Sequence, residues 1–139
     1  MFVDRGRKSL PLGYEMNAHP ASSVEDLHAA LRDYVIPVRN SIAPGEPFAL
    51  APHIGSKLAA ELSLQGVAEQ VGAWLRNHDF HIYTVNAFPL QDFHARRVKE
   101  AVYVPSWAVA TRAKITNRIA DALVRLGPTS RLLTISTLG

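Results

Sequence analysis

Runs typical of β-strands alternate with amphipathic helical stretches along most of this chain of 139 residues. The strand-like runs are short and end in Pro, Ser or Gly; they cover residues 12–20, 48–56, 80–89 and 130–139. Between them, apolar residues recur at three- and four-residue steps, over residues 24–42, 56–79 and 108–127. This βαβαβαβ order favours a parallel sheet with right-handed crossovers. We therefore expect an α/β fold.

Local signals predict where the helices begin, bend and end. Ser22-Ser23-Val24-Glu25 has the spacing of a capping box, so a helix should begin there. Pro37 predicts a bend over residues 33–36, because proline removes one helical hydrogen bond. Gly66 is expected to divide the second helical stretch, and Gly127-Pro128 to end the third. The first helix should bury one apolar face, made of Val24, Leu27, Leu31, Tyr34, Val35, Val38 and Ile42.

Two parallel architectures fit this order: an open doubly wound sheet and part of a (β/α)8 TIM barrel. Neither a Gly-x-Gly-x-x-Gly motif nor a Walker loop follows any strand, so the usual nucleotide signatures of open sheets are absent and the barrel is favoured. A closed barrel needs about 250 residues. We expect residues 12–139, with four strands and three helical segments, to form the N-terminal half of a barrel truncated at its C-terminus, after a polar leader at 1–11. A complete small open-sheet protein is the alternative.

Composition excludes several classes of function. The net charge is only +3, and basic residues are interspersed with acidic ones, so no nucleic-acid partner is expected. The chain has no cysteine, which excludes disulfides and thiolate metal sites and fits a reducing compartment. No apolar run approaches the roughly 18 residues of a membrane span, and the first residues lack the apolar core of a signal peptide. We expect a cytoplasmic protein without direct membrane insertion.

One short motif occurs twice, each time directly after a strand. Asn17-Ala18-His19-Pro20 returns as Asn86-Ala87-Phe88-Pro89, two βα units later. Alternate strands of a barrel contribute to the same layer of its interior. We therefore expect Asn17 and Asn86 to lie on the same side, facing one pocket.

Several longer stretches carry a family likeness. "LGYEMNAHP", "ALRDYVIPVR", "FALAPHIG", "IYTVNAFP", "DFHARRVKEAVYVPSW" and "ISTLG" together resemble the N-terminal half of the EboE-type metabolite-traffic proteins, over residues 12–138. The most specific part is the loop that follows "NAFP". Members of that family have proline where this chain has Gly139, and they continue into a second half-barrel.

The resemblance implies a xylose isomerase-like barrel, related to sugar phosphate isomerases and epimerases and encoded in the Ebo operons. It implies a small polar metabolite as ligand and other proteins of the same operon as partners. Related isomerases hold a divalent metal on carboxylates and a histidine, supplied mainly by later strands. A metal would then be bound only together with the missing C-terminal half, and catalytic residues stay unassigned.

Polar residues at the carboxyl ends of the strands are the candidates for substrate binding, because barrel sites are built there. Asparagine and histidine there can exchange hydrogen bonds with a sugar-like ligand, or can simply terminate strands. In the long loop, histidine and arginine can bind an anion, or can form a solvated turn. The candidate substrate-binding residues are Asn17, His19, His53, Asn86, His94 and Arg97.

The remaining aromatic and histidine residues have simpler expected roles. Tyr103 and Trp107 are candidates for the pocket rim or for packing in the core. His28, His78 and His81 are expected to be structural. The chain itself is expected to act as an isomerase-like enzyme only within a whole barrel, or as a non-catalytic carrier of a metabolite. Unpaired edges of a four-stranded sheet predict self-association.

Overall fold

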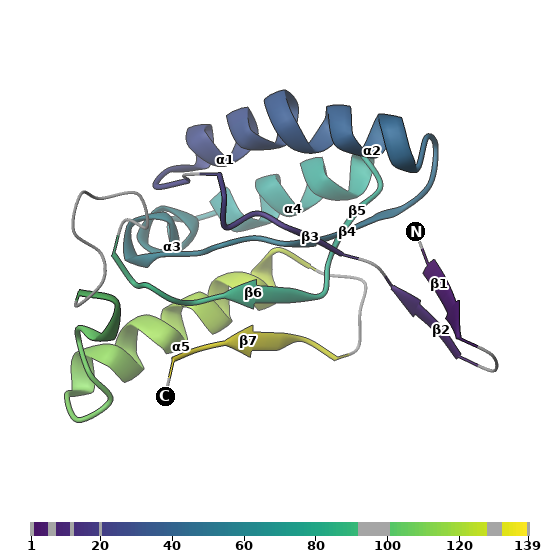
Figure 1. Cartoon of the computed structure of the whole chain (residues 1–139). Helices are drawn as coiled ribbons and strands as arrows, with labels where there is room; N and C mark the ends of the chain where they lie inside the picture. Colours follow the sequence, from purple (N-terminus) through teal and green to yellow (C-terminus); the bar gives the residue numbers. More distant parts are fainter. Residues whose placement is uncertain are drawn as a thin grey trace.

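The parallel strands lie side by side in the order in which they occur in the sequence (Figure 1). The computed structural model describes residues 2–5, 8–11, 13–19, 21–91, 101–127 and 132–138. Strand β4 pairs with β3 on one side and β5 on the other, and β6 pairs with β7; their bounds are β3 (Gly13–Glu15), β4 (Phe48–Ala51), β5 (Phe80–Ile82), β6 (Thr84–Asn86) and β7 (Thr134–Ser136). The expected α/β class with parallel strands is confirmed.

Strands β5 and β6 together form the single strand expected at 80–89, interrupted at Tyr83. Leu50 pairs with Ile82, and His53 forms an isolated parallel bridge with Asn86. The segment of β5 and β6 therefore carries one residue more than β4 between these two pairs. An extra residue in one strand bends it locally, as in a β-bulge. The bridge links the β3–β4–β5 group to the β6–β7 pair.

The first helical stretch is one helix with a π-helical middle. It consists of α1 (Val24–Ala30), η1 (Leu31–Val35) and α2 (Ile36–Ile42). Immediately before Pro37, which has no N–H to donate, the Ile36 N–H bonds to the carbonyl of Leu31, five residues back, so this turn is π-helical. The bend expected over residues 33–36 stays a prediction. The π turn also shifts the helical register. Tyr34 and Ile42 are consequently 54% and 52% exposed, so the prediction that they belong to the buried face was wrong.

The capping residues of the first helix differ by one position from the expectation. Ser23 is the N-cap: its hydroxyl accepts from the Asp26 N–H at 3.0 Å, while the Asp26 carboxylate accepts from the Ser23 N–H at 3.1 Å. The box is therefore Ser23 with Asp26 rather than Ser22 with Glu25. Aspartate can close the box because a carboxylate of either length can accept from the N-cap backbone.

The other helices begin and end close to the predicted positions. Gly66, with φ of +78°, separates α3 (Ser56–Leu62) from α4 (Val67–Asn77). A 3₁₀ turn, η2 (Ala101–Tyr103), precedes α5 (Ala110–Arg125). Gly127 follows α5 with φ of +64°, the left-handed conformation that glycine adopts without steric cost at a helix end.

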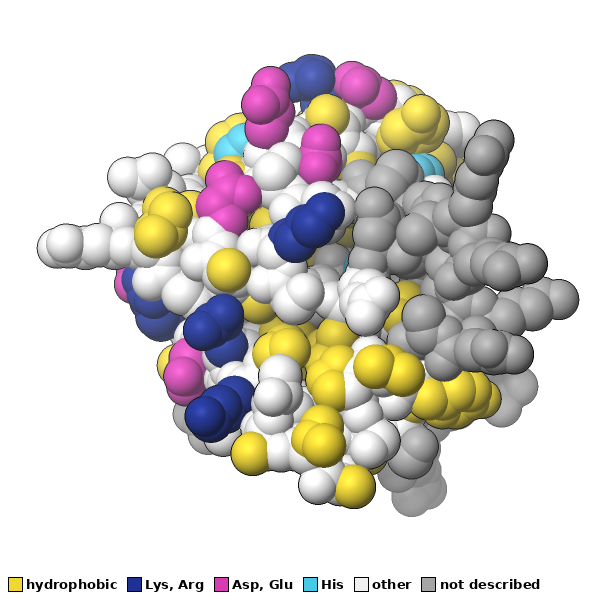
Figure 2. Space-filling view, turned by 90° about the vertical axis from the view of Figure 1, so that its left-hand side faces the viewer, with side chains coloured by type: hydrophobic (Ala, Val, Ile, Leu, Met, Phe, Trp, Pro, Cys, Tyr) yellow, Lys and Arg dark blue, Asp and Glu magenta, His cyan; other side chains and the backbone are white. Residues whose placement is uncertain are grey.

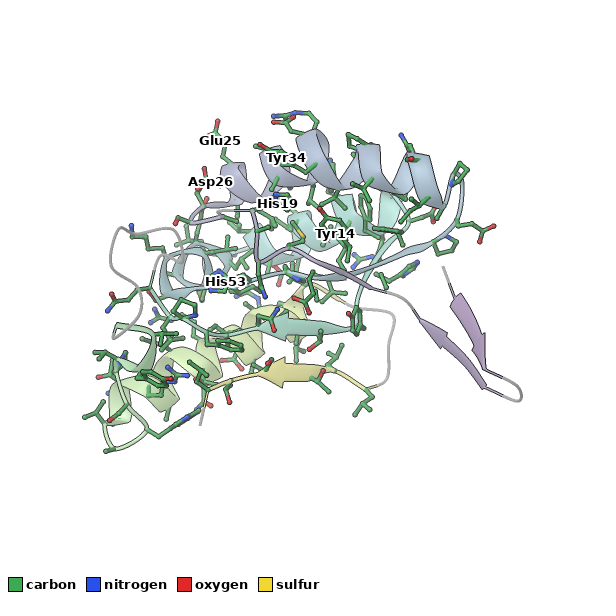
Figure 3. The ribbon with its side chains drawn as sticks, viewed as in Figure 1. Tyr14, His19, Glu25, Asp26, Tyr34 and His53 are labelled. Atoms are coloured by element: carbon green, nitrogen blue, oxygen red, sulfur yellow. The ribbon has the colours of Figure 1, made fainter. Side chains whose placement is uncertain are left out.

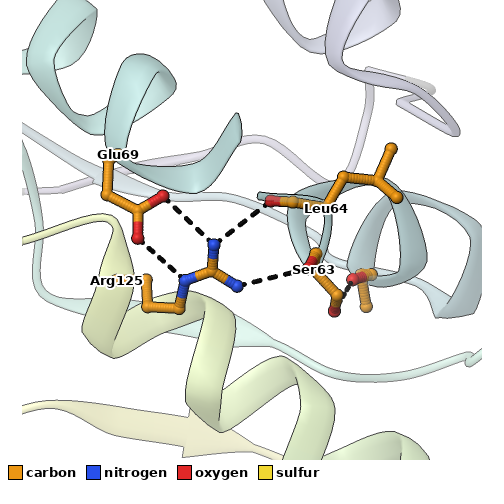
Figure 4. Close-up of polar contacts among 5 residues, drawn as sticks. Ser63, Leu64, Glu69 and Arg125 are labelled. Carbon is orange, nitrogen blue, oxygen red and sulfur yellow. Dashed lines mark hydrogen bonds and ion pairs between the residues drawn. The ribbon is translucent and has the colours of Figure 1, made fainter. Parts of the chain in front are cut away.

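A single arginine joins α5 to the turn between α3 and α4 (Figure 4). The Nε and Nη2 atoms of Arg125 donate to the two carboxylate oxygens of Glu69 at 2.9 and 3.1 Å. Its Nη1 and Nη2 also donate to the backbone carbonyls of Ser63 and Leu64 at 3.3 and 3.1 Å. This planar, two-pronged contact links α5 to α4 and to the turn that precedes α4.

The hydrophobic core lies between the strands and the helices. Alternate strand residues point toward the helical layer, as the two-residue period of a strand requires. The fully buried side chains include Leu31, Phe48, Leu50, Leu58, Leu62, Phe80, Val85, Ile119 and Leu123. The helices in Figure 1 lie behind and above the strands, and in the described part of the chain none covers the opposite face. That face exposes Glu15, Thr134 and Ser136.

The polar leader contains an element that was not predicted. Strands β1 (Phe2–Arg5) and β2 (Lys8–Pro11) form an antiparallel hairpin, with Phe2 opposite Pro11 and Arg5 opposite Lys8. Figure 1 shows it projecting away from the parallel strands. Within the described residues, no helix is both long enough and apolar enough to cross a membrane.

His28 predicts a loss of stability in acid. Its ring stacks on Trp74 at 5.0 Å, and its buried Nε2 has no hydrogen-bond partner in the described part of the chain. Burial, then the positive charges of Arg32 and His78, lower the pKa of His28 below its ordinary 6.5. The unfolded chain therefore binds this proton more readily, and stability falls as the pH drops through the unfolded-state pKa.

Urea unfolding from about pH 8 to about pH 5 measures this effect. His28→Phe keeps a ring against Trp74 but cannot titrate, so its stability should fall less over the same range. A pH dependence identical to that of the wild type would contradict the assignment to His28.

Candidate functional site

Asn86 joins the ends of two strands through its side chain. Its Nδ2 donates to Glu15 Oε2 at 2.7 Å and to Asn17 Oδ1 at 3.0 Å. Asn86 is only 5% exposed, whereas Glu15 is exposed and Asn17 is half-buried. The expectation that the two asparagines lie on the same side is confirmed. They are in direct contact, although they are far apart in the sequence.

Backbone hydrogen bonds on both sides of its strand fix the position of Asn86. The Asn86 N–H donates to the Pro52 carbonyl and its own carbonyl accepts from the Ile54 N–H, both at 2.9 Å. The Ala87 N–H donates to the carbonyl of Ser136, also at 2.9 Å. The orientation of the amide follows from its partner, because a carboxylate can only accept, so the nitrogen must face Glu15.

Tyr83 packs on the same helix-free face as Glu15. Its ring lies against Gly13, where an added Cβ would come within 2.2 Å of the tyrosine oxygen. Glycine at this position therefore lets the ring lie against β3. Burial, and then the negative charge of Glu15, raise the pKa of Tyr83 above 10.0. The Tyr83 hydroxyl stays protonated at neutral pH and can both donate and accept a hydrogen bond.

A pocket of about 320 Å³ lies at the carboxyl ends of the strands. His53, which is 7% exposed, lines it, and its Nε2 lies 2.8 Å from the carbonyl oxygen of Pro89. The remaining lining residues come from the loops after β3 and β6 and the start of α3: Ala21, Ser22, Gly55, Ser56, Lys57, Leu58, Leu90 and Gln91. His53 forms a backbone bridge with Asn86, so the pocket lies next to the polar cluster of Glu15, Asn17 and Asn86, although none of these three residues lines it.

His19 occupies a different setting from the two asparagines. Its Nε2 lies 2.8 Å from the Tyr14 hydroxyl, and its ring stacks on Tyr34 at 4.5 Å (Figure 3). Tyr14 alternates with Glu15 along β3, so this aromatic group lies on the helical side. The structure therefore brings Asn17 and Asn86 together and leaves His19 apart from them. His94 and Arg97 lie outside the described residues.

Sequence reasoning missed Glu15 as a member of the site. A signal was present, because Glu15 precedes Asn17 by two positions and alternate strand residues share a face. Sequence reasoning named no residue with which Asn86 would pair. A buried amide on a strand needs acceptors, and the carboxylate and the second amide supply them.

The described residues do not form a metal site. No group of three or more His, Asp or Glu side chains in the described part of the chain is arranged to hold a metal ion. Glu15 is accompanied by amides instead of further carboxylates. The chemistry available at this site is hydrogen bonding by one carboxylate, two amides and a phenol.

Comparisons with known proteins add no relative. No protein-family model, curated protein or solved structure was found to match this chain.

Proposed function

We propose that this chain is the N-terminal half of an EboE-like, xylose isomerase-like barrel and binds a small polar metabolite at the carboxyl ends of its strands. The observation that carries the proposal is the hydrogen bonding of Asn86 to both Glu15 and Asn17 at those ends. Barrel enzymes build their sites at this end of the sheet.

The strand order supports a barrel over a doubly wound sheet. Neighbouring strands follow the chain order, with no reversal among the described strands. A doubly wound sheet has helices on both faces and a reversal of order where its ligand binds. Here the helices cover one face, as they do on the outside of a barrel. The cytoplasm, operon-encoded partner proteins and self-association through the outer edges of β3 and β7 belong to the same proposal.

The chemistry of the polar cluster suits a polyhydroxylated ligand. The exposed Glu15 carboxylate can accept hydrogen bonds from two neighbouring hydroxyls, and Asn17 and Tyr83 can each donate as well as accept. A polyol offers both roles at every hydroxyl. His53 and the loops around it would then contact the part of the ligand that enters the adjoining pocket. No step of this binding function requires a metal.

A titration with defined sugars tests this proposal. We expect saturable shifts of the Asn86 side-chain amide signals in ¹H–¹⁵N NMR spectra with at least one of xylose, ribose and myo-inositol or their phosphates. Glu15→Gln keeps an acceptor for Asn86 but removes the charge, so binding should weaken about tenfold. Glu25→Gln, an exposed change on α1, is the matched control and should bind as the wild type does.

Two outcomes would contradict the binding function: no saturable shift with any probe, or equal affinity in Glu15→Gln and the wild type. Conversion of the bound sugar on addition of a divalent ion would favour an isomerase or epimerase. Binding without conversion would favour a non-catalytic carrier.

A further inference from the structure

Arg112 is a buried cation with two nitrogen atoms that find no partner among the described residues. It lies in the first turn of α5, is 2% exposed, and its buried Nε and Nη2 atoms have no hydrogen-bond partner in the described part of the chain. A buried charge without a hydrogen-bonded partner is strongly unfavourable. The burial of this charge therefore points to a partner that the described part of the chain does not supply.

We propose that Arg112 binds the oxyanion, carboxylate or phosphate, of a small molecule. The Nε–H and one Nη2–H of a guanidinium point in parallel from the same edge of its plane, which matches the spacing of two oxygens on one anion. The two atoms without a partner are this pair. A single point charge would not require both, whereas a carboxylate or phosphate would use them together.

Arg125, on the same helix, shows this edge in use. Its Nε and Nη2 donate to the two oxygens of the Glu69 carboxylate at 2.9 and 3.1 Å (Figure 4). The two arginines thus differ in a decisive way: Arg125 is half-buried and paired through this edge, whereas Arg112 is more deeply buried and unpaired among the described residues. The proposed ligand takes the place that Glu69 has beside Arg125.

The surroundings of Arg112 form a pocket suited to an anion. A pocket of about 230 Å³ is lined by Tyr103, Pro105, Ser106, Trp107, Ala108, Arg112 and Leu138. The guanidinium carbon lies 5.1 Å from the centre of the Trp107 ring, and the Trp107 Nε1 donates to the Leu138 carbonyl at 2.7 Å. The ring packs against the guanidinium and holds its plane in place.

The beginning of α5 adds a second attraction for negative charge. Its N-cap residue, Val109, provides no side-chain hydrogen bond, and the first turn contains no acidic residue. The positive end of this long helix is therefore not neutralised within the described residues. An anion bound there would be attracted by the positive end of α5 as well as by the Arg112 guanidinium.

An apolar rim suggests that the anion belongs to an organic molecule. Tyr103, Val104, Trp107 and Val109 are each exposed by 46% or more. Figure 2 views the end of the molecule toward which β6 and β7 run, and hydrophobic side chains gather on the lower part of that face. This pocket shares no lining residue with the one beside His53. The proposal therefore goes beyond the polyol site and does not depend on it.

Thermal unfolding in different salts tests the proposal. At equal ionic strength, we expect sodium phosphate or sodium acetate to raise Tm above its value in sodium chloride and to shift the Arg112 Nε–H signal in NMR spectra. A response to phosphate alone would assign the ligand as a phosphate, and a response to acetate alone as a carboxylate. Arg112→Lys keeps the charge but loses the two-pronged edge, so affinity for the effective anion should fall about tenfold.

Arg112→Met distinguishes a ligand-binding arginine from a structural one, because loss of a structural arginine would lower the melting temperature. In chloride it should melt at or above the wild-type temperature, because a buried charge without a partner is removed, and it should lose the response to anions. Arg118→Met, an exposed change on α5, is the matched control. The proposal is overturned if neither anion raises Tm. It also fails if Arg112→Met melts well below wild type in chloride and Asp92→Asn or Glu100→Gln reproduces that loss, since the partner would then lie within the chain.

Discussion

Replacing Gly72 by alanine is expected to lower the free energy of unfolding by about 3 kcal/mol, although alanine is the better helix former. Gly72 lies in α4, and a Cβ there would come within 1.9 Å of the Leu126 carbonyl oxygen and 2.7 Å of its carbonyl carbon. These are backbone atoms, and the oxygen also accepts from Arg76 Nη1 at 2.8 Å. The contact therefore cannot be relieved by rotating a side chain.

Urea denaturation of the Gly72→Ala variant measures this loss. Gly45→Ala is the control, because Gly45 has φ of +75° but a Cβ added there would meet no atom within 4 Å. It should cost only about 1 kcal/mol, from backbone strain alone. If Gly72→Ala were as stable as the wild type, α4 could not pack against the end of α5 as closely as described.

Asn86→Asp is expected to destabilise the protein by about 2 to 4 kcal/mol at neutral pH, because it sets a second carboxylate against Glu15. The change preserves the shape of the side chain and replaces the nitrogen, which donates to Glu15 at 2.7 Å, by an oxygen. Adding Glu15→Gln should restore most of the loss, since the new amide can donate to the introduced carboxylate. Chemical denaturation of both single variants and the double variant measures the coupling.

The pH dependence of Asn86→Asp has a definite sign. Repulsion between the two carboxylates raises their pKa values in the folded state above those of the unfolded chain. The folded state therefore binds more protons, and the variant should regain stability as the pH falls through the raised pKa. Asn40→Asp, an exposed change on α2, should show no such recovery. Equal behaviour of the two variants would mean that Asn86 does not face Glu15.

Much of the fold was predictable because its signals are local. Pro37 removes a hydrogen bond wherever it stands in a helix, and glycine adopts the left-handed backbone seen at Gly66 and Gly127. These positions mark a π-helical turn, a break between two helices and a helix end. The placement of Asn17 and Asn86 on the same side followed from a repeated motif and the layering of parallel strands. The helix signals depend only on residue type, and the placement of the two asparagines depends only on the order of the strands along the chain.

Other features depend on contacts that a linear pattern does not contain. Tyr34 lies inside the π-helical segment, where the helical period of 3.6 that defines the apolar stripe does not apply. The extra residue at Tyr83 interrupts the strand, but residues 80–89 read in sequence as one continuous strand with no signal for a break there. His19 shares a motif with Asn17, yet its ring turns to Tyr14 and Tyr34. Arg112 resembles its exposed neighbours in sequence, and only the tertiary structure buries it.

The most direct test of the site is the environment of the Asn86 side-chain amide, measured by nuclear Overhauser effects in a ¹⁵N-edited NMR spectrum. The structure predicts contacts from the Asn86 Nδ2 protons to the side-chain CH₂ groups of both Glu15 and Asn17, and slowed exchange of these protons with water. Amide protons that exchange freely and show contacts only within the β6 segment would contradict the claim that the carboxyl ends of these strands converge on one site.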